Sequence, residues 1–264
     1  MMRNIDLSNI DTDYLRAKSR LILLDYDGTL IPFDLHPKDS KPSVSAKLIL
    51  RSLAADPKNC IVLISGREKE NLETFWGDLQ IVLVAEHGAF YKQLNGSWKT
   101  MFSSSVTWMP QALTALNALS FQYQGSFVEK KKYSVVWHYR AIADNVTESD
   151  RRQILAALRS LPMSKHFVIS HNEFTIELRS PEIDKGSFVA RWIGGQYFDF
   201  VMAIGDSQTD EDLFDILDSN SYSIRVGKSD HSSAHFYLEN QTAVLPLLQR
   251  LSETQRVELE KDGM

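Results

Sequence analysis

The stretch LILLDYDGTL, from Leu21 to Leu30, begins with four aliphatic residues and then places two aspartates on either side of one tyrosine. An unbroken aliphatic run of this kind is typical of a strand buried on both faces of a parallel sheet. Asp25 and Asp27 are two residues apart, so in an extended chain their side chains leave the same face. Gly28 then allows a tight turn out of the strand. The stretch therefore predicts a core strand that brings two carboxylates to one point.

Similar strands recur along the chain, separated by segments with helical periodicity. The further apolar runs are CIVLIS (60–65), IVLVA (81–85) and FVMAI (200–204). Between the first two strands, Ser43 predicts the N-cap of a crossover helix. The predicted apolar face of this helix consists of Val44, Leu48, Ile49 and Leu53. Strands that alternate with helices in this way predict βαβ units around a parallel sheet.

This pattern is interrupted after the third strand. Asn95-Gly96 predicts a hairpin, and the serines at 103–105 form a polar break. The residues that follow predict a helix, two strands, a second helix and two more strands, before the parallel pattern returns. We therefore predict two domains: a discontinuous parallel-sheet core at residues 1–104 and 183–264, and an α+β insert at residues 105–182.

The composition narrows the class of partner. Twenty-nine basic and thirty-four acidic residues give a net charge of −5 without a basic block, so neither nucleic acid nor an anionic membrane is expected. The N-terminus lacks the apolar region of a signal peptide, and no run has membrane-spanning length. The single cysteine, Cys60, opens a predicted strand and is expected to be structural. We expect a small-molecule partner and a reducing, cytoplasmic location.

The residues suited to chemistry follow the predicted strands, at the sheet edge where open α/β sheets bind ligands. Asp25 and Asp27 repel each other unless a cation lies between them or one carries a proton. Asp25 can act as a nucleophile that forms an aspartyl-phosphate, Asp27 can transfer a proton, and Mg²⁺ can neutralise the charge. Asp206, at the end of DFVMAIGD, supplies a further oxygen ligand from a neighbouring strand.

Two further groups are suited to phosphate. Ser65, Gly66 and Arg67 follow the second strand at a predicted turn into a helix, where N–H groups and a hydroxyl form a phosphate seat. Taken alone, this tripeptide is also an ordinary helix start. Lys185, which is followed by Gly186, can supply a cation that offsets Asp25 and the phosphate. The alternative for this lysine is a solvated charge before a helix.

The motifs DYDGT, SGR, KG and GDSQTD occur in this order on these elements, and the order resembles the haloacid dehalogenase (HAD) superfamily of aspartate-nucleophile phosphatases. The resemblance implies a Rossmann-like core with an inserted α+β cap of the C2 type. AEHG, SFVEKKKYSVVWHYR, TIELR and GDSQTDEDLF make the chain similar to trehalose-6-phosphate phosphatases, closest to the phosphatase part of bifunctional trehalose synthase/phosphatases. It thus implies hydrolysis of trehalose 6-phosphate, with a synthase as a possible partner.

The resemblance also implies roles for individual residues. Asp25 is implied as nucleophile and Asp27 as general acid/base. The implied Mg²⁺ ligands are Asp25, Asp206 and the main-chain carbonyl of Asp27, with Asp210 in support. Phosphate is assigned to Ser65, Gly66 and Lys185, and the rest of the substrate to Arg67, His87, Glu129, Lys131, Arg140 and Glu177. For His87, at the end of the third strand, packing at the connection to the insert is an equal alternative.

The residues of FVEKKKYSVVWHYR that share a strand face can be read from their parity. Glu129 and Lys131 share one parity, and Ser134, Val136, His138 and Arg140 share another, so strands here would group these polar side chains. A face of this composition suits a sugar with many hydroxyls. Cross-strand ion pairs on an exposed sheet face are the alternative.

Two departures from the family pattern affect these expectations. Ser207 replaces a common aspartate and is expected to alter the outer shell of the metal, and HNEF (171–174) replaces a glycine-containing turn and can reshape the sugar pocket. Another sugar phosphate, such as sucrose 6-phosphate or mannosyl-3-phosphoglycerate, therefore stays an alternative, as does a silent domain that regulates a trehalose synthase. His231 and His235 have the spacing of a helical zinc pair but lack a third ligand.

Overall fold

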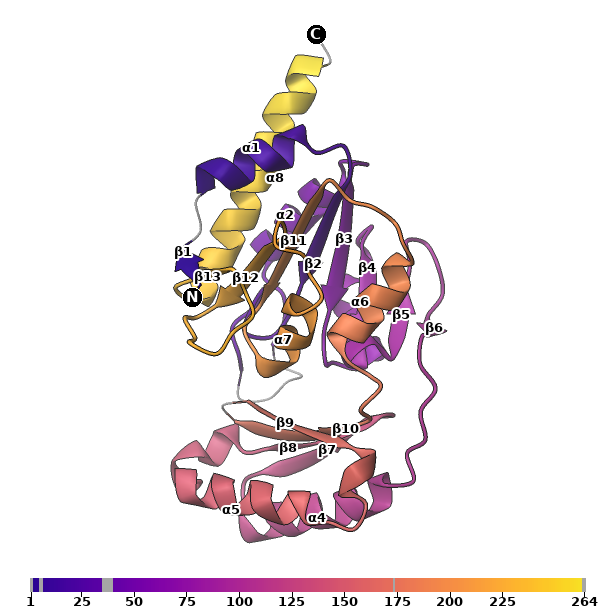
Figure 1. The fold of residues 1–264 in the computed structure, drawn as a ribbon, viewed down its shortest axis with the longest axis vertical. Coiled ribbons are helices and arrows are strands. Elements are labelled where there is room, and N and C mark those ends of the chain that lie inside the picture. Colours follow the sequence, from indigo (N-terminus) through magenta and orange to yellow (C-terminus); the bar gives the residue numbers. More distant parts are fainter. Residues whose placement is uncertain (1, 5–6, 35–39, 173, 263–264) are drawn as a thin grey trace. The chain divides into compact units, whose positions relative to one another are not determined.

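The computed structural model describes residues 2–4, 7–34, 40–172 and 174–262 of the chain (Figure 1). The chain divides into two compact units. The first unit is Met1–Met101 together with Lys185–Met264, and the second unit is Phe102–Asp184. Among the described residues, none of the helices has both the length and the apolar character that a membrane crossing requires.

The first unit is built on one sheet. Its described strands follow the order β1 (Arg3–Asn4), β13 (Phe236–Leu238), β12 (Tyr222–Val226), β11 (Phe200–Gly205), β2 (Arg20–Leu24), β3 (Asn59–Ile64), β4 (Val82–Ala85), β5 (Phe90–Lys92) and β6 (Lys99–Thr100). Pairing is parallel from β1 to β4, and β5 and β6 add an antiparallel hairpin. The hairpin at Asn95-Gly96 is confirmed, and Asn95 has a φ of 56°.

The predicted aliphatic strand, β2, lies in the middle of this sheet. Every residue of β2 is buried, and it pairs with β3 on one side and β11 on the other. From β2 the chain moves to β3, whereas from β11 it moves the other way to β12. The carboxyl ends of β2 and β11 therefore meet where the strand order reverses, which is the usual ligand position in open α/β sheets.

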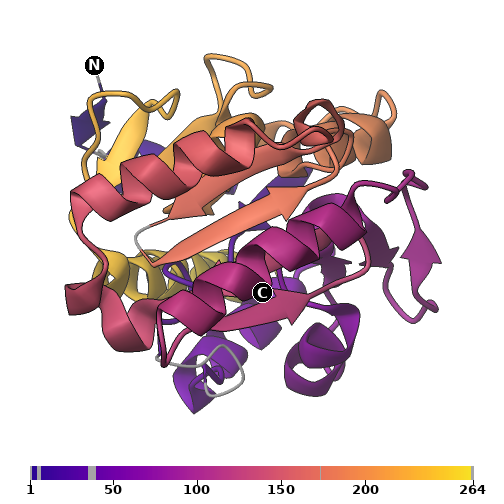
Figure 2. The same ribbon diagram turned by 90° about the horizontal axis from the view of Figure 1, so that it is seen from below.

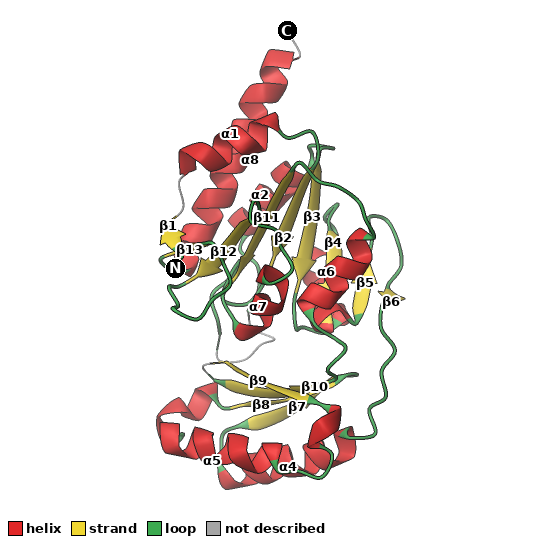
Figure 3. Cartoon of the chain, viewed as in Figure 1, coloured by secondary structure: helices red, strands yellow, loops and turns green. Residues whose placement is uncertain are grey.

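Helices lie on both faces of the sheet of the first unit. They are α1 (Leu7–Arg16), α2 (Val44–Ala54), α3 (Lys69–Trp76), α6 (Lys185–Ile193), α7 (Gln208–Phe214) and α8 (Val244–Asp262). Figure 3 shows α6 and α7 in front of the sheet and α2 behind it. Right-handed crossovers explain this division, because the chain crosses the sheet in one direction through α2 and in the other through α7.

The predicted N-cap of α2 is confirmed, but its predicted apolar face is only partly correct. The Ser43 side chain accepts a hydrogen bond from the main-chain N–H of Ala46 at 3.1 Å. Val44 and Leu48, both assigned to the apolar face, are 77% and 56% exposed. The buried residues are Ala46, Leu50 and Leu53. Helix α8 packs against α2, so the neighbour rather than the largest side chains selects the buried face.

A buried ion pair fixes the other end of β2. Arg20 donates from Nη1 to Asp56 Oδ2 at 2.8 Å and from Nε to the carbonyl oxygen of Tyr14 at 2.7 Å. Both charged side chains are almost fully buried. The pair joins α1, the start of β2 and the turn after α2, far along the strand from Asp25. We therefore regard it as a structural counterpart to the polar groups at the carboxyl end.

The second unit is a four-stranded antiparallel sheet with two helices on one face. The strand order is β7 (Phe127–Lys130), β8 (Ser134–His138), β10 (Thr175–Arg179) and β9 (Val168–Asn172). Helices α4 (Met109–Gln122) and α5 (Glu148–Arg159) lie side by side along this sheet (Figure 2). The hydrophobic core of this unit includes Trp137, Ile176 and Leu178. Because strand residues alternate between faces, their polar neighbours occupy the opposite face.

Candidate functional site

Four strand ends of the first unit carry the polar residues that the sequence singles out. Asp25 follows β2, Ser65 follows β3, His87 follows β4 in the short helix η2 (Glu86–Gly88), and Asp206 follows β11. Parallel strands bring these ends to one edge of the sheet. We refer to Asp25, Asp27, Ser65, Lys185, Asp206 and Asp210 as the strand-end site.

Lys185 connects two of the carboxylates at this site. It is the first residue of α6, and its Nζ lies 2.6 Å from Asp25 Oδ1 and 2.7 Å from Asp210 Oδ1. All three side chains are buried. Burial favours the neutral amine, but Asp210 and Asp25 outweigh it and raise the pKa of Lys185. This lysine is thus a fixed, desolvated cation and not a solvated charge before a helix.

Asp206 lies beside this lysine-centred group. Its Oδ1 accepts a hydrogen bond from Thr29 Oγ1 at 3.1 Å. A Cβ on Gly28, which has a φ of +83°, would lie 2.5 Å from Asp206 Oδ2, so only glycine permits this approach. One carboxylate oxygen each from Asp25, Asp206 and Asp210 lies within 4.8 Å of the others. Gly28, in the turn after β2, therefore leaves the space that the carboxylate of Asp206, the residue after β11, occupies.

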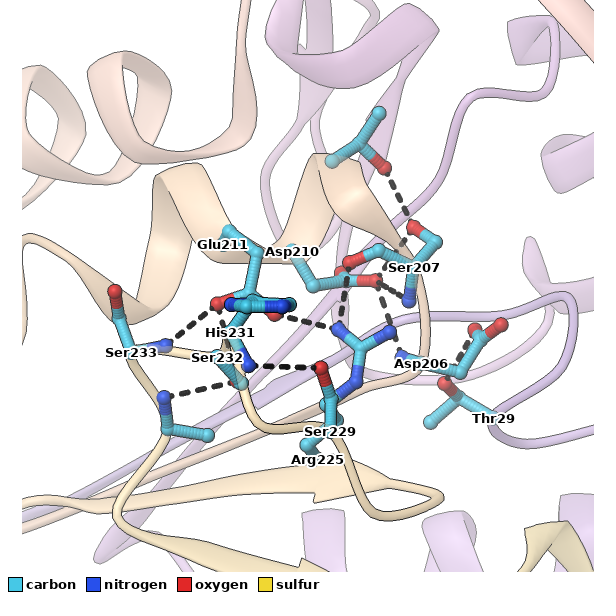
Figure 4. Close-up of polar contacts among 12 residues, drawn as sticks. Thr29, Asp206, Ser207, Asp210, Glu211, Arg225, Ser229, His231, Ser232 and Ser233 are labelled. Carbon is cyan, nitrogen blue, oxygen red and sulfur yellow. Dashed lines mark hydrogen bonds and ion pairs between the residues drawn. The ribbon is translucent and has the colours of Figure 1, made fainter. Parts of the chain in front are cut away.

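Asp210 is held by hydrogen bonds at the start of α7. Its Oδ2 accepts from Asp206 N at 3.2 Å, from Ser207 N at 2.9 Å and from Ser207 Oγ at 2.8 Å. Figure 4 shows this capping arrangement, with Ser207 directly beside Asp210. Since Oδ1 is bound to Lys185, both oxygens of Asp210 have partners. Asp210 is therefore suited to positioning its neighbours, and Ser207 takes part as the helix cap.

A second layer supports this turn, and sequence reasoning missed it. Arg225 of β12 donates to the carbonyl oxygen of Ser207 at 3.3 Å and forms an ion pair with Glu211 (Figure 4). Glu211 also accepts from Ser233 N at 2.8 Å and Ser232 Oγ at 3.1 Å. The loop after β12 is thereby tied to α7. The signal in the sequence that could have revealed this layer is the arginine of β12, Arg225, together with the acidic first turn of α7.

The electrostatics of the strand-end site favour a bound cation. Burial raises the pKa of Asp25 to about 6, although Lys185 opposes the shift. Burial, followed by the charges of Asp25 and Asp210, raises the pKa of Asp206 well above its ordinary value. Carboxylates in this position take up either a proton or a cation. The possible metal ligands of Asp25, Asp206 and Asp210 are all carboxylate oxygens, which suit Mg²⁺ better than a metal that prefers nitrogen or sulfur.

Asp27 is bound by Arg67. The guanidinium donates from Nε to Asp27 Oδ2 at 2.6 Å and from Nη2 to Asp27 Oδ1 at 2.7 Å. Sequence reasoning assigned Arg67 to the substrate and did not anticipate this pair. The signal that could have revealed it is the opposite charge at two neighbouring strand ends, β2 and β3.

The turn after β3 holds Ser65, Gly66 and Arg67 in the first unit. Ser65 is buried, and its Oγ accepts a hydrogen bond from Arg67 N at 3.2 Å. Helix α3 begins two residues later, at Lys69. The His87 ring lies against Gly66, since a Cβ at Gly66 would approach His87 Cε1 within 2.7 Å. His87 N also donates to the carbonyl oxygen of Ser65 at 3.0 Å. His87 therefore packs against the turn after β3.

The second unit carries its own group of charged side chains on the sheet face opposite its core. Glu129 Oε2 lies 2.8 Å from His138 Nε2, and Lys131 Nζ lies 3.7 Å from Glu129 and 3.9 Å from Glu177. Strand pairing places Glu129 and Glu177 on either side of Val136. We call Glu129, Lys131, His138 and Glu177 the polar sheet face. Burial opposes ionisation of Glu129, but Lys131 and His138 outweigh it and lower its pKa to about 2.

Arg140 lies outside this strand arrangement. Strand β8 ends at His138, and Arg140 begins the short helix η3 (Arg140–Asn145), so the predicted common strand face does not extend to it. Tyr139 N still donates to the carbonyl oxygen of Phe174 at 3.0 Å, which continues the pairing of β8 with β10, but Tyr139 has a ψ of 16° and the chain leaves the extended conformation there. The Arg140 guanidinium carbon lies 4.3 Å from the centre of the Phe174 ring. The HNEF segment thus supports Arg140; its third residue, Glu173, lies outside the described residues.

Two other residue types singled out in the sequence have no metal or nucleophile geometry. His231 and His235 lie in the loop between β12 and β13, where helical spacing does not apply. In the described part of the chain, the group able to hold a metal is Asp25 with Asp206 and Asp210. Cys60 lies at the start of β3, and burial raises its pKa to about 11. A protonated thiol is a poor nucleophile.

Sequence comparisons with known proteins identify relatives of this chain. The trehalose-phosphatase family model matches residues 23–242. A bifunctional trehalose-6-phosphate synthase/phosphatase from Thermoproteus tenax is 30% identical over 95% of this chain and 34% of its own length. The chain spans about a third of the length of the curated relatives that it matches first. The family resemblance carried by the motifs is confirmed.

Solved structures show the same fold. The C-terminal domain of a C. albicans trehalose-6-phosphate phosphatase matches with a TM-score of 0.91 and 27% identity, covering 96% of this chain and 98% of that chain. A haloacid dehalogenase-like hydrolase from B. subtilis matches with a TM-score of 0.60 and 13% identity, covering 88% of this chain and 99% of that chain. The predicted α/β fold, a HAD core with an α+β insert, is confirmed.

Proposed function

Because the chain belongs to the trehalose-phosphatase family, we propose that it hydrolyses trehalose 6-phosphate to trehalose and inorganic phosphate. The observation that carries the proposal is the buried contact of Lys185 with Asp25 and Asp210 at the strand-end site. A desolvated lysine beside a carboxylate nucleophile can offset the negative charge of both the nucleophile and a phosphate.

In the first half of the proposed reaction, a carboxylate oxygen of Asp25 attacks phosphorus. The bond between phosphorus and the sugar oxygen breaks, and a proton from Asp27 passes to that oxygen, so that trehalose leaves as a neutral alcohol. In the second half, Asp27 takes a proton from a water molecule as this water attacks phosphorus. The bond between Asp25 and phosphorus then breaks, inorganic phosphate is released, and both carboxyl groups return to their starting state.

We assign phosphate binding and metal binding to residues at and beside the strand-end site. Ser65, Gly66 and Lys185 would hold the phosphate oxygens. Mg²⁺ would be held by Asp25, Asp206 and the main-chain carbonyl of Asp27, with Asp210 in support, and when bound it supplies positive charge against the phosphoryl oxygens. Removal of divalent cations with EDTA should abolish phosphate release, and added Mg²⁺ should restore it. Undiminished turnover in EDTA would contradict this assignment.

The sugar is assigned to the second unit. Glu129, Lys131 and Glu177 of the polar sheet face, together with Arg140, would bind the hydroxyl groups of the disaccharide, and His87 is the weaker candidate for a substrate contact. Residues 105–182 would then act as a C2-type cap domain, and residues 1–104 with 183–264 as the catalytic core. Contacts with the part of the substrate that does not react supply binding energy that favours the correct substrate.

A trehalose-6-phosphate synthase is the proposed partner. Support comes from the Thermoproteus tenax relative, whose name combines synthase and phosphatase. The product of such a synthase is the substrate proposed here. Purification of this chain together with a synthase from the same cells would support the partnership, and its reproducible absence from such preparations would weaken it.

The substrate is tested by phosphate release from a panel of phosphate esters in the presence of Mg²⁺. The panel contains trehalose 6-phosphate, sucrose 6-phosphate, mannosyl-3-phosphoglycerate, glucose 6-phosphate and p-nitrophenyl phosphate. Trehalose 6-phosphate should give the highest kcat/KM. A different best substrate would overturn the sugar assignment and leave a phosphatase. Binding of trehalose 6-phosphate without any phosphate release would instead favour a silent regulatory domain.

A further inference from the structure

The pair formed by Arg67 and Asp27 assigns a role to an arginine that the reaction described above does not use. We propose that Arg67 is a positioning residue: it fixes the carboxyl group of Asp27 for proton transfer to the departing sugar oxygen. The inference rests on the proposed function and deepens it. Its basis is the two-point contact, in which Nε and Nη2 donate to separate oxygens of Asp27 at 2.6 and 2.7 Å.

Arg67 is itself fixed by the core, so it can determine where Asp27 points. The arginine side chain is 5% exposed, whereas that of Asp27 is 27% exposed. The guanidinium carbon lies 4.9 Å from the centre of the Tyr26 ring. Tyr26 in turn packs edge-on against Trp76, and its hydroxyl donates to the carbonyl oxygen of Ser40 at 2.9 Å. The more exposed carboxylate therefore adopts the direction that the buried arginine imposes.

The main chain of Arg67 is held as firmly as its side chain. Arg67 N donates to Ser65 Oγ at 3.2 Å, and the carbonyl oxygen of Arg67 accepts from Glu86 N at 2.9 Å. Glu86 and His87 both have positive φ values, 47° and 58°. Non-glycine residues adopt this backbone conformation rarely, and it persists where the surrounding structure requires it. The turns after β3 and β4 thus brace one another around Arg67.

This geometry leaves Asp27 able to transfer a proton. A carboxyl group has about four acceptor positions, and the arginine fork takes one on each oxygen. Each oxygen keeps a position for the transferable proton or for the hydroxyl group that receives it. During transfer, the proton leaves the Asp27 oxygen for the sugar oxygen while the bond between that oxygen and phosphorus breaks. Lysine cannot reproduce the planar two-point contact, although it would keep the positive charge.

Two phosphate esters with different leaving groups can show whether Arg67 acts by positioning Asp27 or by supporting the structure of the whole site. A sugar alkoxide is a poor leaving group and needs the proton from Asp27, whereas p-nitrophenolate leaves as a stable anion. The test compares kcat/KM for trehalose 6-phosphate and p-nitrophenyl phosphate in wild type, Arg67→Gln and Arg67→Lys. Both variants should lose about 100-fold on the sugar phosphate, and less than about fivefold on the aryl phosphate. A ratio of the two losses near one would overturn the proposal.

The double variant provides a second test, which asks whether the losses caused by the two substitutions are independent. If Arg67 acts through Asp27, then Arg67→Gln combined with Asp27→Asn should be no slower on the sugar phosphate than Asp27→Asn alone. Multiplied losses would overturn the proposal. Arg225→Gln removes another arginine–carboxylate pair that does not involve Asp27, and any loss it causes should be equal for the two esters.

The same measurements separate this inference from the proposed function. Hydrolysis of neither ester by the wild-type protein would overturn the proposed function and the role of Arg67 with it. Hydrolysis of both esters, with equal losses in the Arg67 variants, would leave the proposed function standing and overturn the role of Arg67 alone.

Discussion

The strand-end site and the polar sheet face are both groups of charged residues, but they are held in different ways. At the strand-end site, buried carboxylates follow central strands and have main-chain as well as side-chain partners, such as the N–H groups that bind Asp210. On the polar sheet face, side chains contact one another: Glu129 lies 2.8 Å from His138, and Lys131 lies 3.7 Å from Glu129 and 3.9 Å from Glu177. We expect the first arrangement to perform the reaction and the second to select the substrate.

The largest expected effect tests whether the strand-end site carries the reaction. Asp25→Asn removes the proposed nucleophile and keeps its shape, so phosphate release should fall at least about 1,000-fold for every ester in the panel. The measurement is initial-rate phosphate release. Asp25→Asn activity within tenfold of wild type would contradict a covalent mechanism on this residue.

Asp56→Asn is the matched control, because it neutralises another buried aspartate of the same unit. Asp56 is paired with Arg20 at the opposite end of the sheet. Breaking a buried pair should lower the free energy of unfolding by about 3–5 kcal/mol, while kcat/KM of the folded fraction stays near that of wild type. Loss of activity in the folded Asp56 variant would show that buried charge in general, and not its place at the strand ends, supports turnover.

A smaller effect is expected where HNEF supports Arg140. Phe174→Leu keeps an apolar side chain but removes the ring that lies beneath the guanidinium. Loss of a cation–π contact of about 0.5–1 kcal/mol should raise KM for trehalose 6-phosphate about threefold. Phe121→Leu is the control in the same unit, since Phe121 is 86% exposed on α4. Equal KM values for the two variants would remove Phe174 from the account of sugar binding.

The smallest expected effect concerns stability in acid. Glu129 has a pKa of about 2 in the folded protein, below the ordinary value of about 4.3 in an unfolded chain. Its contribution to stability is therefore complete above about pH 4.3 and is lost as the pH falls toward 2. Wild type should lose more unfolding free energy than Glu129→Gln across this range in denaturant titrations. Parallel losses would show that Glu129 is not stabilised as an anion.

The sequence predicts the strand-end site well because topology does most of the work there. Aliphatic runs identify the parallel strands, and parallel strands place the residues that follow them at one edge of the sheet. Asp25, Ser65 and Asp206 can be grouped on this basis from the order of residues alone. The pairing of Arg67 with Asp27 cannot, because it depends on the direction of two side chains across neighbouring turns.

Sequence patterns are less informative where a neighbour selects the outcome. The periodicity of α2 predicts Val44 and Leu48 as core residues, but packing of α8 against this helix leaves both exposed. Alternation along β8 predicts a face that includes Arg140, but the strand stops at His138. Odd and even positions assign side chains to opposite faces only while the chain stays extended. That condition ends at Tyr139, whose ψ of 16° takes the chain out of the extended conformation.

The division of labour between the two regions is the central claim, and one variant tests it directly. In Glu177→Gln, which removes one charge from the polar sheet face, we would measure kcat/KM for trehalose 6-phosphate relative to p-nitrophenyl phosphate. Loss of a hydrogen bond to a charged group at about 1.5–3 kcal/mol predicts that this ratio falls about 10- to 150-fold. A ratio equal to that of wild type would contradict the claim that the polar sheet face selects the sugar while the strand-end site performs the reaction.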